Sequence, residues 1–375
     1  MREQEMAGQK IGIVGGYGRV GEETAWHLIA NTGYDIVVAG RDPEKADKTA
    51  KKLGGRRVSG EAVDINDRDM LDAFCKGCDL VINCAGPSWR ILDRIAAAAL
   101  RQGVHYVDPG GYEPLVNALS GKQKQLEEKR LVFIVAAGLL PGMSGLFPAY
   151  VVQSCFDHVD SLEVYYVGHD KWTFNSAYDI ASSLDGSDAW ETAYYENGET
   201  KKAGLFSMSK KTALPAPIGT IRSYLMFTGE LKKVVEANGV KTAHAYGTNS
   251  GRRMPMVMAS IKLFRQSRTH EQRLRAANRI VRAAEKDLRK KEPCFMVHVV
   301  AEGEEKERQK KLAATLSFKD TYKPTGVVAA NTARFVIENK VNGSGLFLLP
   351  ESVDVKDFMS LLEKESFRFN ISEIS

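Results

Sequence analysis

The sequence predicts an α/β protein with a doubly wound parallel sheet and an inserted α+β domain. Strand and helix patterns alternate from residue 10 to about residue 135, which is typical of a parallel sheet with helices on both faces. Between about residues 150 and 320 the alternation stops, and aromatic, β-rich stretches such as SLEVYYVG and CFMVHVVAEG appear. With 375 residues, of which 43% are hydrophobic, the chain is long enough for two domains with separate cores.

The first strand, expected at Ile11–Val14, leads into a glycine-rich loop before a helix. The loop has GxGxxG spacing and consists of Gly16, Tyr17, Gly18, Arg19, Val20 and Gly21. In a Rossmann-type site the three glycines allow, in order, a tight turn, the approach of backbone to a pyrophosphate, and close helix–strand packing. The helix N-terminus then offers free N–H groups to the phosphates. The alternative is a turn without a ligand; a second strand that ends about twenty residues further on favours a dinucleotide site.

The second strand, expected at Tyr34–Ala39, is followed by a cation where many dinucleotide-binding chains carry an acid. A carboxylate there would accept hydrogen bonds from the ribose of NAD, whereas the fork of an arginine suits a phosphate. We therefore expect Arg41 to bind the 2′-phosphate of NADP; a solvated surface charge is the alternative. Asp42 is expected to cap the next helix, whose first residue would be Pro43.

Four more strands complete the predicted sheet. The third contains residues 61–65, the fourth spans 79–84, the fifth 105–107 and the sixth 131–136, with helices at 67–74 and 91–102. Ligands of such sheets lie beyond the carboxyl ends of the strands. The loops at these ends are therefore expected to supply the further cofactor contacts Asp64, Ile65, Cys84, Ala85, Gly86, Pro87 and Gly110.

Asp108 is the candidate catalytic residue, because a carboxylate at a strand end beside Pro-Gly-Gly could face the nicotinamide and transfer a proton. The alternative is that Asp108 caps this turn by accepting backbone hydrogen bonds. Cys84 has no nearby cation that would make it a thiolate, so we expect it to line the pocket and not to act as a nucleophile.

Four segments together resemble saccharopine dehydrogenase-like proteins: GGYGRVG, VAGRDPEKA, NCAGP and HYVDPGG. The stretch DTYKPTGVVAANTARFVIENKVNGSGLFLLPESV, residues 320–353, is similar to the returning helix and closing segment of that family. The resemblance implies a dinucleotide-binding domain at 1–147, an inserted substrate and dimerisation domain at 148–319, and a return of 320–375 to the first domain. It also implies an NADP(H)-dependent oxidoreductase, expected as a homodimer, that acts on the carbon–nitrogen bond of an amino-acid-derived substrate. Leu140 stands where saccharopine-reducing members carry an acid, which argues against saccharopine itself.

The inserted segment is strongly basic. Residues 201–300 contain 21 Lys and Arg against 6 Asp and Glu, a net charge of +15 in a chain whose total is +5. Many of these charges lie on a helix expected at 269–293, which begins with a Thr269–Gln272 capping box, and a solvated helix face explains most of them. Arg252 and Arg253 follow a Gly/Asn/Ser-rich loop, and we expect one of them to bind the carboxylate of a small anionic substrate.

Two other functions are compatible with these features. A tailoring reductase could act on an imine or thiazoline held by an acidic carrier protein, with the basic segment as its docking surface. A non-catalytic dinucleotide-binding protein could keep the fold without the chemistry.

Composition argues against several further classes. The chain begins without a signal-peptide pattern, its longest apolar stretch, 131–140, is too short to cross a bilayer, and no nucleic-acid motif accompanies the basic segment. Its five cysteines suggest neither a disulfide framework nor a zinc site. We therefore expect a cytoplasmic protein without a bound metal.

Overall fold

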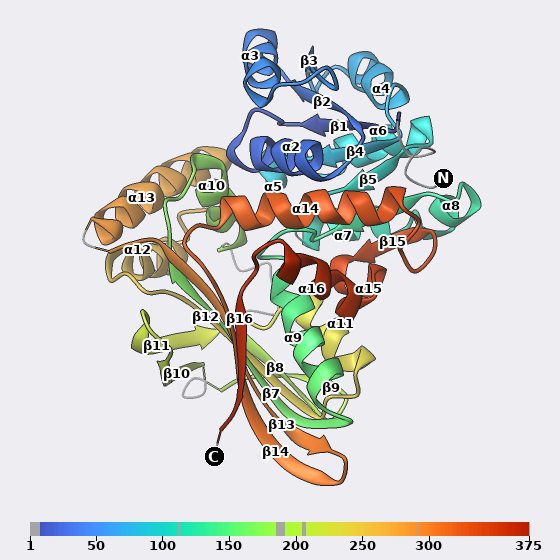
Figure 1. Ribbon diagram of the computed structural model, residues 1–375. Helices are drawn as coiled ribbons and strands as arrows, with labels where there is room; N and C mark the ends of the chain where they lie inside the picture. The colour runs from blue at the N-terminus through green and yellow to red at the C-terminus, as the bar shows by residue number, and fades with distance from the viewer. Residues whose placement is uncertain (1–7, 112, 185–191, 205–207, 290, 375) are drawn as a thin grey trace. The chain divides into compact units, whose positions relative to one another are not determined.

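The computed structural model describes residues 8–111, 113–184, 192–204, 208–289 and 291–374. The chain forms two compact units (Figure 1). Unit 1 contains Met1–Met143 and Tyr322–Asp354, and unit 2 contains Ser144–Thr321 and Val355–Ser375.

Unit 1 is built on a seven-stranded sheet in the order β15-β6-β5-β4-β1-β2-β3, and all of its pairings are parallel. The strands are β1 (Lys10–Val14), β2 (Asp35–Gly40), β3 (Val58–Ala62), β4 (Leu80–Asn83), β5 (His105–Val107), β6 (Val132–Val135) and β15 (Gly345–Leu348). The order reverses between β1 and β4, which is the point where doubly wound sheets bind ligands. The predicted α/β fold with a doubly wound parallel sheet is confirmed.

Helices cover both faces of this sheet. On one face α2 (Arg19–Asn31) contacts β1 and β2, α3 (Pro43–Leu53) contacts β2 and β3, and α14 (Tyr322–Ile337) lies beside α2 (Figure 1). The opposite face carries α4 (Arg68–Lys76) and α6 (Arg94–Gln102), which contact each other. The remaining helices of unit 1 are α5 (Ser88–Ile91), α7 (Glu113–Ser120), α8 (Gln123–Glu128) and α15 (Leu349–Ser352). A strand buried on both sides is hydrophobic at successive positions, as Ile36–Ala39 are here.

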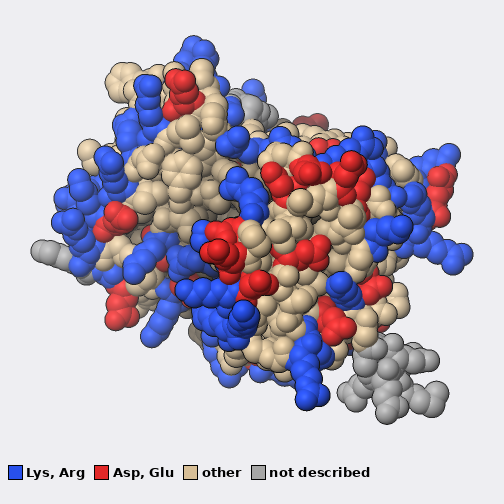
Figure 2. All heavy atoms as spheres, turned by 90° about the horizontal axis from the view of Figure 1, so that it is seen from above, with Lys and Arg blue, Asp and Glu red and all other residues tan. Residues whose placement is uncertain are grey.

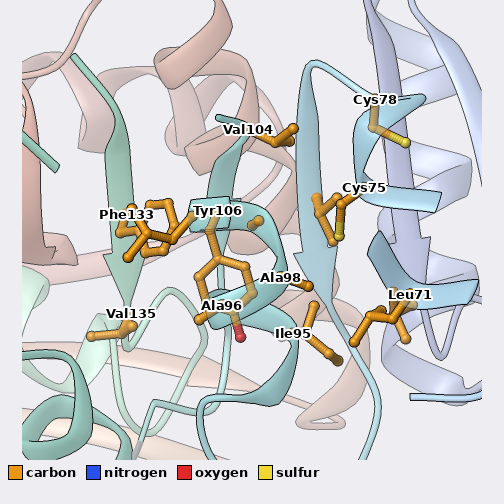
Figure 3. Packing of buried hydrophobic residues seen from close by; sticks show 14 of the residues in the cluster. Leu71, Cys75, Cys78, Ile95, Ala96, Ala98, Val104, Tyr106, Phe133 and Val135 are labelled. Carbon is orange, nitrogen blue, oxygen red and sulfur yellow. The ribbon is translucent and has the colours of Figure 1, made fainter. Parts of the chain in front are cut away.

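The core between the sheet and α6 centres on Tyr106 of β5. Its ring packs against Phe133 of β6 at 5.3 Å between centroids, and Ile95 and Ala98 of α6 lie on its other side (Figure 3). Tyr106 is fully buried, so its hydroxyl needs a partner within the protein.

Two predicted elements of unit 1 differ from the structure. The third strand was expected at 61–65 and instead spans Val58–Ala62; it is the edge strand and largely exposed, so its residues carry little hydrophobic pattern. The helix expected at 91–102 is divided into α5 and α6, because Leu92 adopts a left-handed φ of 49° that ends the first helix.

Unit 2 contains a nine-stranded sheet whose main path is β10-β11-β12-β7-β13-β14-β16, with β8 and β9 branching from β12. Its strands are β7 (His158–His169), β8 (Ala193–Glu196), β9 (Glu199–Lys202), β10 (Ser209–Leu214), β11 (Gly219–Leu225), β12 (Thr242–Asn249), β13 (Cys294–Glu305), β14 (Arg308–Phe318) and β16 (Phe369–Glu373). Its helices are α9 (Met143–Cys155), α10 (Phe174–Ser183), α11 (Gly229–Ala237), α12 (Arg253–Leu263), α13 (His270–Leu288) and α16 (Val355–Lys364). Only β7 and β12 pair in parallel among the described pairings of this sheet.

The basic helix of unit 2 begins as predicted. Thr269 accepts a hydrogen bond from Gln272 N (3.2 Å), and the Gln272 side chain accepts one from Thr269 N, which completes the capping box. The most buried residues of α13 are Ala276, Ala277, Ile280, Ala283 and Ala284. Small residues on this stripe allow α13 to approach α12 and α10 closely.

The last residues of the chain belong to unit 2. Strand β16 pairs antiparallel with β14, and Phe369 packs against Phe147 and Tyr150 of α9 at 5.7 and 5.4 Å between ring centroids. Residues 355–375, expected in the returning part of the first domain, are therefore counted with unit 2, whereas Tyr322–Asp354 return to unit 1. No helix within the described ranges combines the length and the apolar character that a membrane span requires.

This packing leads to a test of the assignment of β16. Phe369→Ala should lower the free energy of unfolding by about 1–3 kcal/mol, because a half-buried ring leaves a cavity between β16 and α9. Urea unfolding measures the loss, and NADPH titration of the folded variant should give the wild-type affinity. Unchanged stability would mean that β16 does not contribute to the core of unit 2.

Candidate dinucleotide-binding site

Glycines form the loop between β1 and α2 because side chains would not fit. Gly15 has a φ of 78°, and a Cβ there would lie 2.7 Å from the Ala85 Cα atom. A Cβ on Gly16 would lie 2.8 Å from the Ile13 carbonyl oxygen, and one on Gly21 would lie 2.7 Å from Gly16 Cα. These contacts allow the tight turn and the close helix packing that the sequence predicts for a dinucleotide loop.

Gly18 is different, because protein packing explains little of its identity. Its φ is −78°, and a Cβ would meet only one atom outside its neighbours within 4 Å, the Gly15 carbonyl oxygen at 3.1 Å. Gly18 is also the N-cap of α2 and offers no side-chain cap, so the first N–H groups of the helix are left for another acceptor. Gly18 and the free N–H groups of the first turn of α2, here called the Gly18 cradle, fit a pyrophosphate.

A backbone hydrogen bond connects the ends of β1 and β4 at the point where the strand order reverses. Cys84 N donates to Val14 O (2.8 Å), which places the Cys84–Pro87 loop beside Gly15. The Cys84 thiol lies 3.8 Å from the Thr24 hydroxyl, and burial raises its pKa to about 12. A thiol that stays protonated at neutral pH is not a nucleophile, and the lining role of Cys84 stays a prediction.

Arg41 and Asp42 follow β2 and have distinct environments. Arg41 is exposed, and its guanidinium makes no hydrogen bond or ion pair with the part of the chain that the structure describes. Asp42 accepts a hydrogen bond from Lys45 N (3.1 Å) and pairs with Lys45 Nζ (2.8 Å), so it caps α3 as predicted. Its hydrogen bonds from Lys45 lower the pKa of Asp42. The acid is therefore engaged, and the exposed cation is available to an anion.

The loop after β3 lies at the edge of the sheet. Asp64 Oδ1 accepts hydrogen bonds from the backbone and side-chain nitrogens of Asn66, both at 2.9 Å, so it closes a turn. Asp64 and Ile65 remain predicted cofactor contacts at the carboxyl end of β3.

Asp108 is buried and holds a polar network at the ends of β4 and β5. Its Oδ2 accepts hydrogen bonds from Tyr106 Oη (2.7 Å) and Asn83 Nδ2 (2.9 Å), and its Oδ1 accepts from Gly110 N (2.7 Å) and Gly111 N (3.2 Å). Burial raises the pKa of Asp108, and these four donors oppose that shift. Because four protein donors already engage both oxygens, the geometry favours the capping role, and proton transfer by Asp108 stays a prediction.

Three residues that the sequence reasoning missed also support this site. Asn83 accepts a hydrogen bond from Ala85 N (3.0 Å) while donating to Asp108, so it fixes the Cys84–Pro87 loop. Tyr106 and Gly15 contribute the buried hydroxyl and the positive φ described above. Asn83 lies within the NCAGP segment, where a polar residue at the end of an apolar strand is the signal that could have identified it.

The substrate-binding candidates lie in unit 2. Arg252 and Arg253 follow β12 and are both exposed. Asp287 accepts hydrogen bonds from Arg253 N at 2.9 and 3.1 Å, which fixes the start of α12. The Arg252 guanidinium has no hydrogen bond or ion pair within the described ranges, so it is the freer of the two candidates.

Charge and metal ligands add little to the definition of a site. On the face drawn in Figure 2, groups of Lys and Arg side chains alternate with Asp and Glu, so the positive charge is not confined to one patch there. No group of three or more His, Cys, Asp or Glu within the described residues is arranged to hold a metal ion.

The fold and the glycine loop of unit 1 define a Rossmann-type dinucleotide-binding protein. Residues 11–132 match the family model of the saccharopine dehydrogenase NADP binding domain. These residues therefore resemble the NADP-binding domain of saccharopine dehydrogenases, and the resemblance and the NADP cofactor predicted from the sequence are confirmed for this part of the chain.

Two curated relatives and one solved structure extend the comparison. The chain is 28% identical to a carboxyaminopropylagmatine dehydrogenase of Synechocystis over 60% of this chain and 58% of that protein. It is also 28% identical to a carboxynorspermidine synthase of Vibrio alginolyticus, over 54% of this chain and 53% of that protein. The match therefore spans little more than half the length of either relative. The apo saccharopine dehydrogenase (L-Glu forming) of Saccharomyces cerevisiae superposes with a TM-score of 0.71 over 98% of this chain and 100% of that chain; at 14% identity the likeness shows the fold alone.

The Asp108 network can be tested by its effect on stability. Asp108→Asn replaces one acceptor oxygen by a donor, so some of the four donors lose their partner, and the free energy of unfolding at pH 7 should fall by about 1–3 kcal/mol. The pKa of Asp108 is raised in the folded protein, so protonation of this carboxyl group stabilises the native state. This stabilisation is complete below the unfolded pKa of about 3.9 and is lost as the pH rises through the folded pKa. The difference between wild type and variant should therefore widen from pH 7 to pH 4 in urea unfolding. Equal stability at both pH values would rule out this supporting role.

Proposed function

We propose that the protein is an NADPH-dependent reductase that converts an imine, formed between an amine and a carbonyl compound that carries a carboxylate, into a secondary amine. The observation that carries the proposal is the NADP-binding domain in which Arg41, exposed and without a partner among the described residues, lies beside an Asp42 that caps α3 and pairs with Lys45. NADPH, when bound, supplies a hydride to the imine carbon, and a proton reaches the nitrogen. The names of the two relatives support the choice of bond, because a carboxy-substituted polyamine or agmatine contains a secondary amine between its two parts.

The chain's own residues would bind and orient in this reaction. The Gly18 cradle at the N-terminus of α2 would bind the pyrophosphate, and Arg41 would bind the 2′-phosphate. Asn83 and Asp108 would hold the loops at the ends of β4 and β5 in a fixed arrangement. Arg252 would bind the carboxylate of the substrate, because its guanidinium is exposed and lacks a partner within the described residues.

The proposal includes a homodimer in the cytoplasm with unit 2 as the substrate and dimerisation domain, all of which rest on the sequence. An imine or thiazoline on an acidic carrier protein is the alternative substrate, supported by the net charge of +15 over residues 201–300 (21 basic against 6 acidic residues). Salt-sensitive binding of the protein to an acidic carrier would favour that alternative. NADPH binding without turnover of any imine would favour a non-catalytic protein.

Arg41→Ala tests the cofactor site. The loss of a charge-assisted bidentate contact of roughly 1.5–3 kcal/mol should weaken NADPH binding about ten- to a hundredfold and leave NADH binding nearly unchanged. Fluorescence titration measures both dissociation constants. Arg56→Ala, which removes another exposed arginine of unit 1, is the matched control and should not change either value. Equal affinities of the wild-type protein for NADPH and NADH would contradict the role of Arg41.

A screen of NADPH oxidation against paired amines and oxo acids tests the reaction. With a productive pair, Arg252→Ala should raise KM for the carboxylate-bearing partner by about tenfold or more, because a desolvated charge pair would be lost, and should not alter NADPH affinity. Arg275→Ala on the exposed face of α13 is the matched control. Wild-type kinetics in Arg252→Ala would move the anion site elsewhere, and the absence of turnover with every pair would overturn the proposed reaction.

A further inference from the structure

The ring of Tyr17 occupies the space beside the last residue of β2. A Cβ placed on Gly40 would lie 2.7 Å from both the Cζ atom and the hydroxyl oxygen of Tyr17. Contacts this short do not occur between real side chains and Cβ atoms, so residue 40 cannot carry a side chain while Tyr17 keeps its position. The glycine at the end of β2 and the tyrosine of the glycine loop are therefore structurally coupled.

The hydroxyl of Tyr17 is oriented by the backbone that follows β2. Asp42 N donates to the Tyr17 hydroxyl oxygen at 3.3 Å, and no acceptor among the described residues takes the hydroxyl proton. The hydroxyl can therefore donate to a ligand. The only acid that directly follows β2, Asp42, has its carboxylate bound by Lys45.

We infer that Tyr17 is a specificity-determining residue, which fills the place of the carboxylate that reads the ribose in NAD-dependent proteins and donates its hydroxyl to the 2′-phosphate of NADP. The inference rests on the cofactor site of the proposed function and assigns its selectivity to a second residue besides Arg41.

The choice between NAD and NADP depends on which groups lie at this end of β2. A carboxylate there would accept hydrogen bonds from the 2′-hydroxyl of NAD and would repel a 2′-phosphate. The Tyr17 ring prevents such a side chain at position 40 and presents a neutral donor there, and Arg41, the residue after Gly40, supplies an exposed cation. Among the described residues, the end of β2 thus offers two donors to the phosphate, while the Asp42 carboxylate is occupied by Lys45. This arrangement selects against NAD and for NADP.

A purely structural role for Tyr17 predicts a different result. If the ring only supported the loop, its loss would weaken NADPH and NADH binding by the same factor. A specificity role changes the ratio of the two dissociation constants, and it makes the effects of substitutions at residues 17 and 40 depend on each other.

The test uses binding alone, measured by fluorescence titration of NADPH and NADH with the full chain. Tyr17→Phe keeps the ring and should weaken NADPH binding several-fold without changing NADH binding. Gly40→Asp should impair binding of both cofactors, because the new side chain meets the ring. The double variant Tyr17→Ala/Gly40→Asp should restore binding and shift the ratio at least tenfold toward NADH. Tyr224→Phe, at an exposed tyrosine of unit 2, is the matched control.

Three outcomes would overturn the inference. Tyr17→Phe could leave the NADPH to NADH ratio unchanged, Gly40→Asp alone could bind NADH as well as the double variant does, or the double variant could bind NADH no better than Tyr17→Ala. If neither protein with Asp at position 40 folds, the ratio measured for Tyr17→Phe decides. Because turnover is not measured, failure of the proposed reaction leaves this test intact, whereas a wild-type protein that binds neither cofactor would overturn both.

Discussion

The close contact between the start of α2 and the Gly15–Gly16 turn is the constraint on which the site depends. A Cβ on Gly21 would lie 2.7 Å from Gly16 Cα, so only glycine allows the helix to begin this near the end of β1. This proximity places the N–H groups of the first turn of α2 beside Gly18. The same turn lies against the loop after β4, because Cys84 N binds the carbonyl of Val14. The site proposed for the pyrophosphate thus consists of backbone groups that close packing holds in position.

A second constraint acts on the neighbouring strand ends. The Asp108 carboxylate binds donors from β4, from β5 and from the Gly110–Gly111 turn, and it is fully enclosed by protein. A buried carboxylate is costly unless such donors surround it, so the network is stable only with all of these loops in place. The carboxylate therefore links the loops that would surround a nicotinamide.

Sequence patterns predicted the elements whose signals are local. Glycine spacing, the apolar strands and the Thr269–Gln272 capping box are properties of neighbouring residues, and the structure has each of them. The edge strand β3 was misplaced because exposed residues give no hydrophobic pattern, and the division of the 91–102 helix depends on the single φ of Leu92. The boundary near residue 355 was missed because the pairing of β16 with β14 joins segments about fifty residues apart.

The sequence by itself determined the fold class, the resemblance of residues 11–132 to the saccharopine dehydrogenase NADP-binding domain and the expectation of NADP, because GxGxxG, the strand–helix alternation and the residues after the second strand are each contained in short segments. Only the tertiary structure decided what surrounds these residues. It placed Tyr17 against Gly40, it bound Asp42 to Lys45, and it enclosed Asp108 with Tyr106 and Asn83. Hydrogen bonding and steric exclusion act between atoms within a few ångströms, and residues such as 17 and 40, or 83 and 108, reach that distance only when parallel strands align their ends.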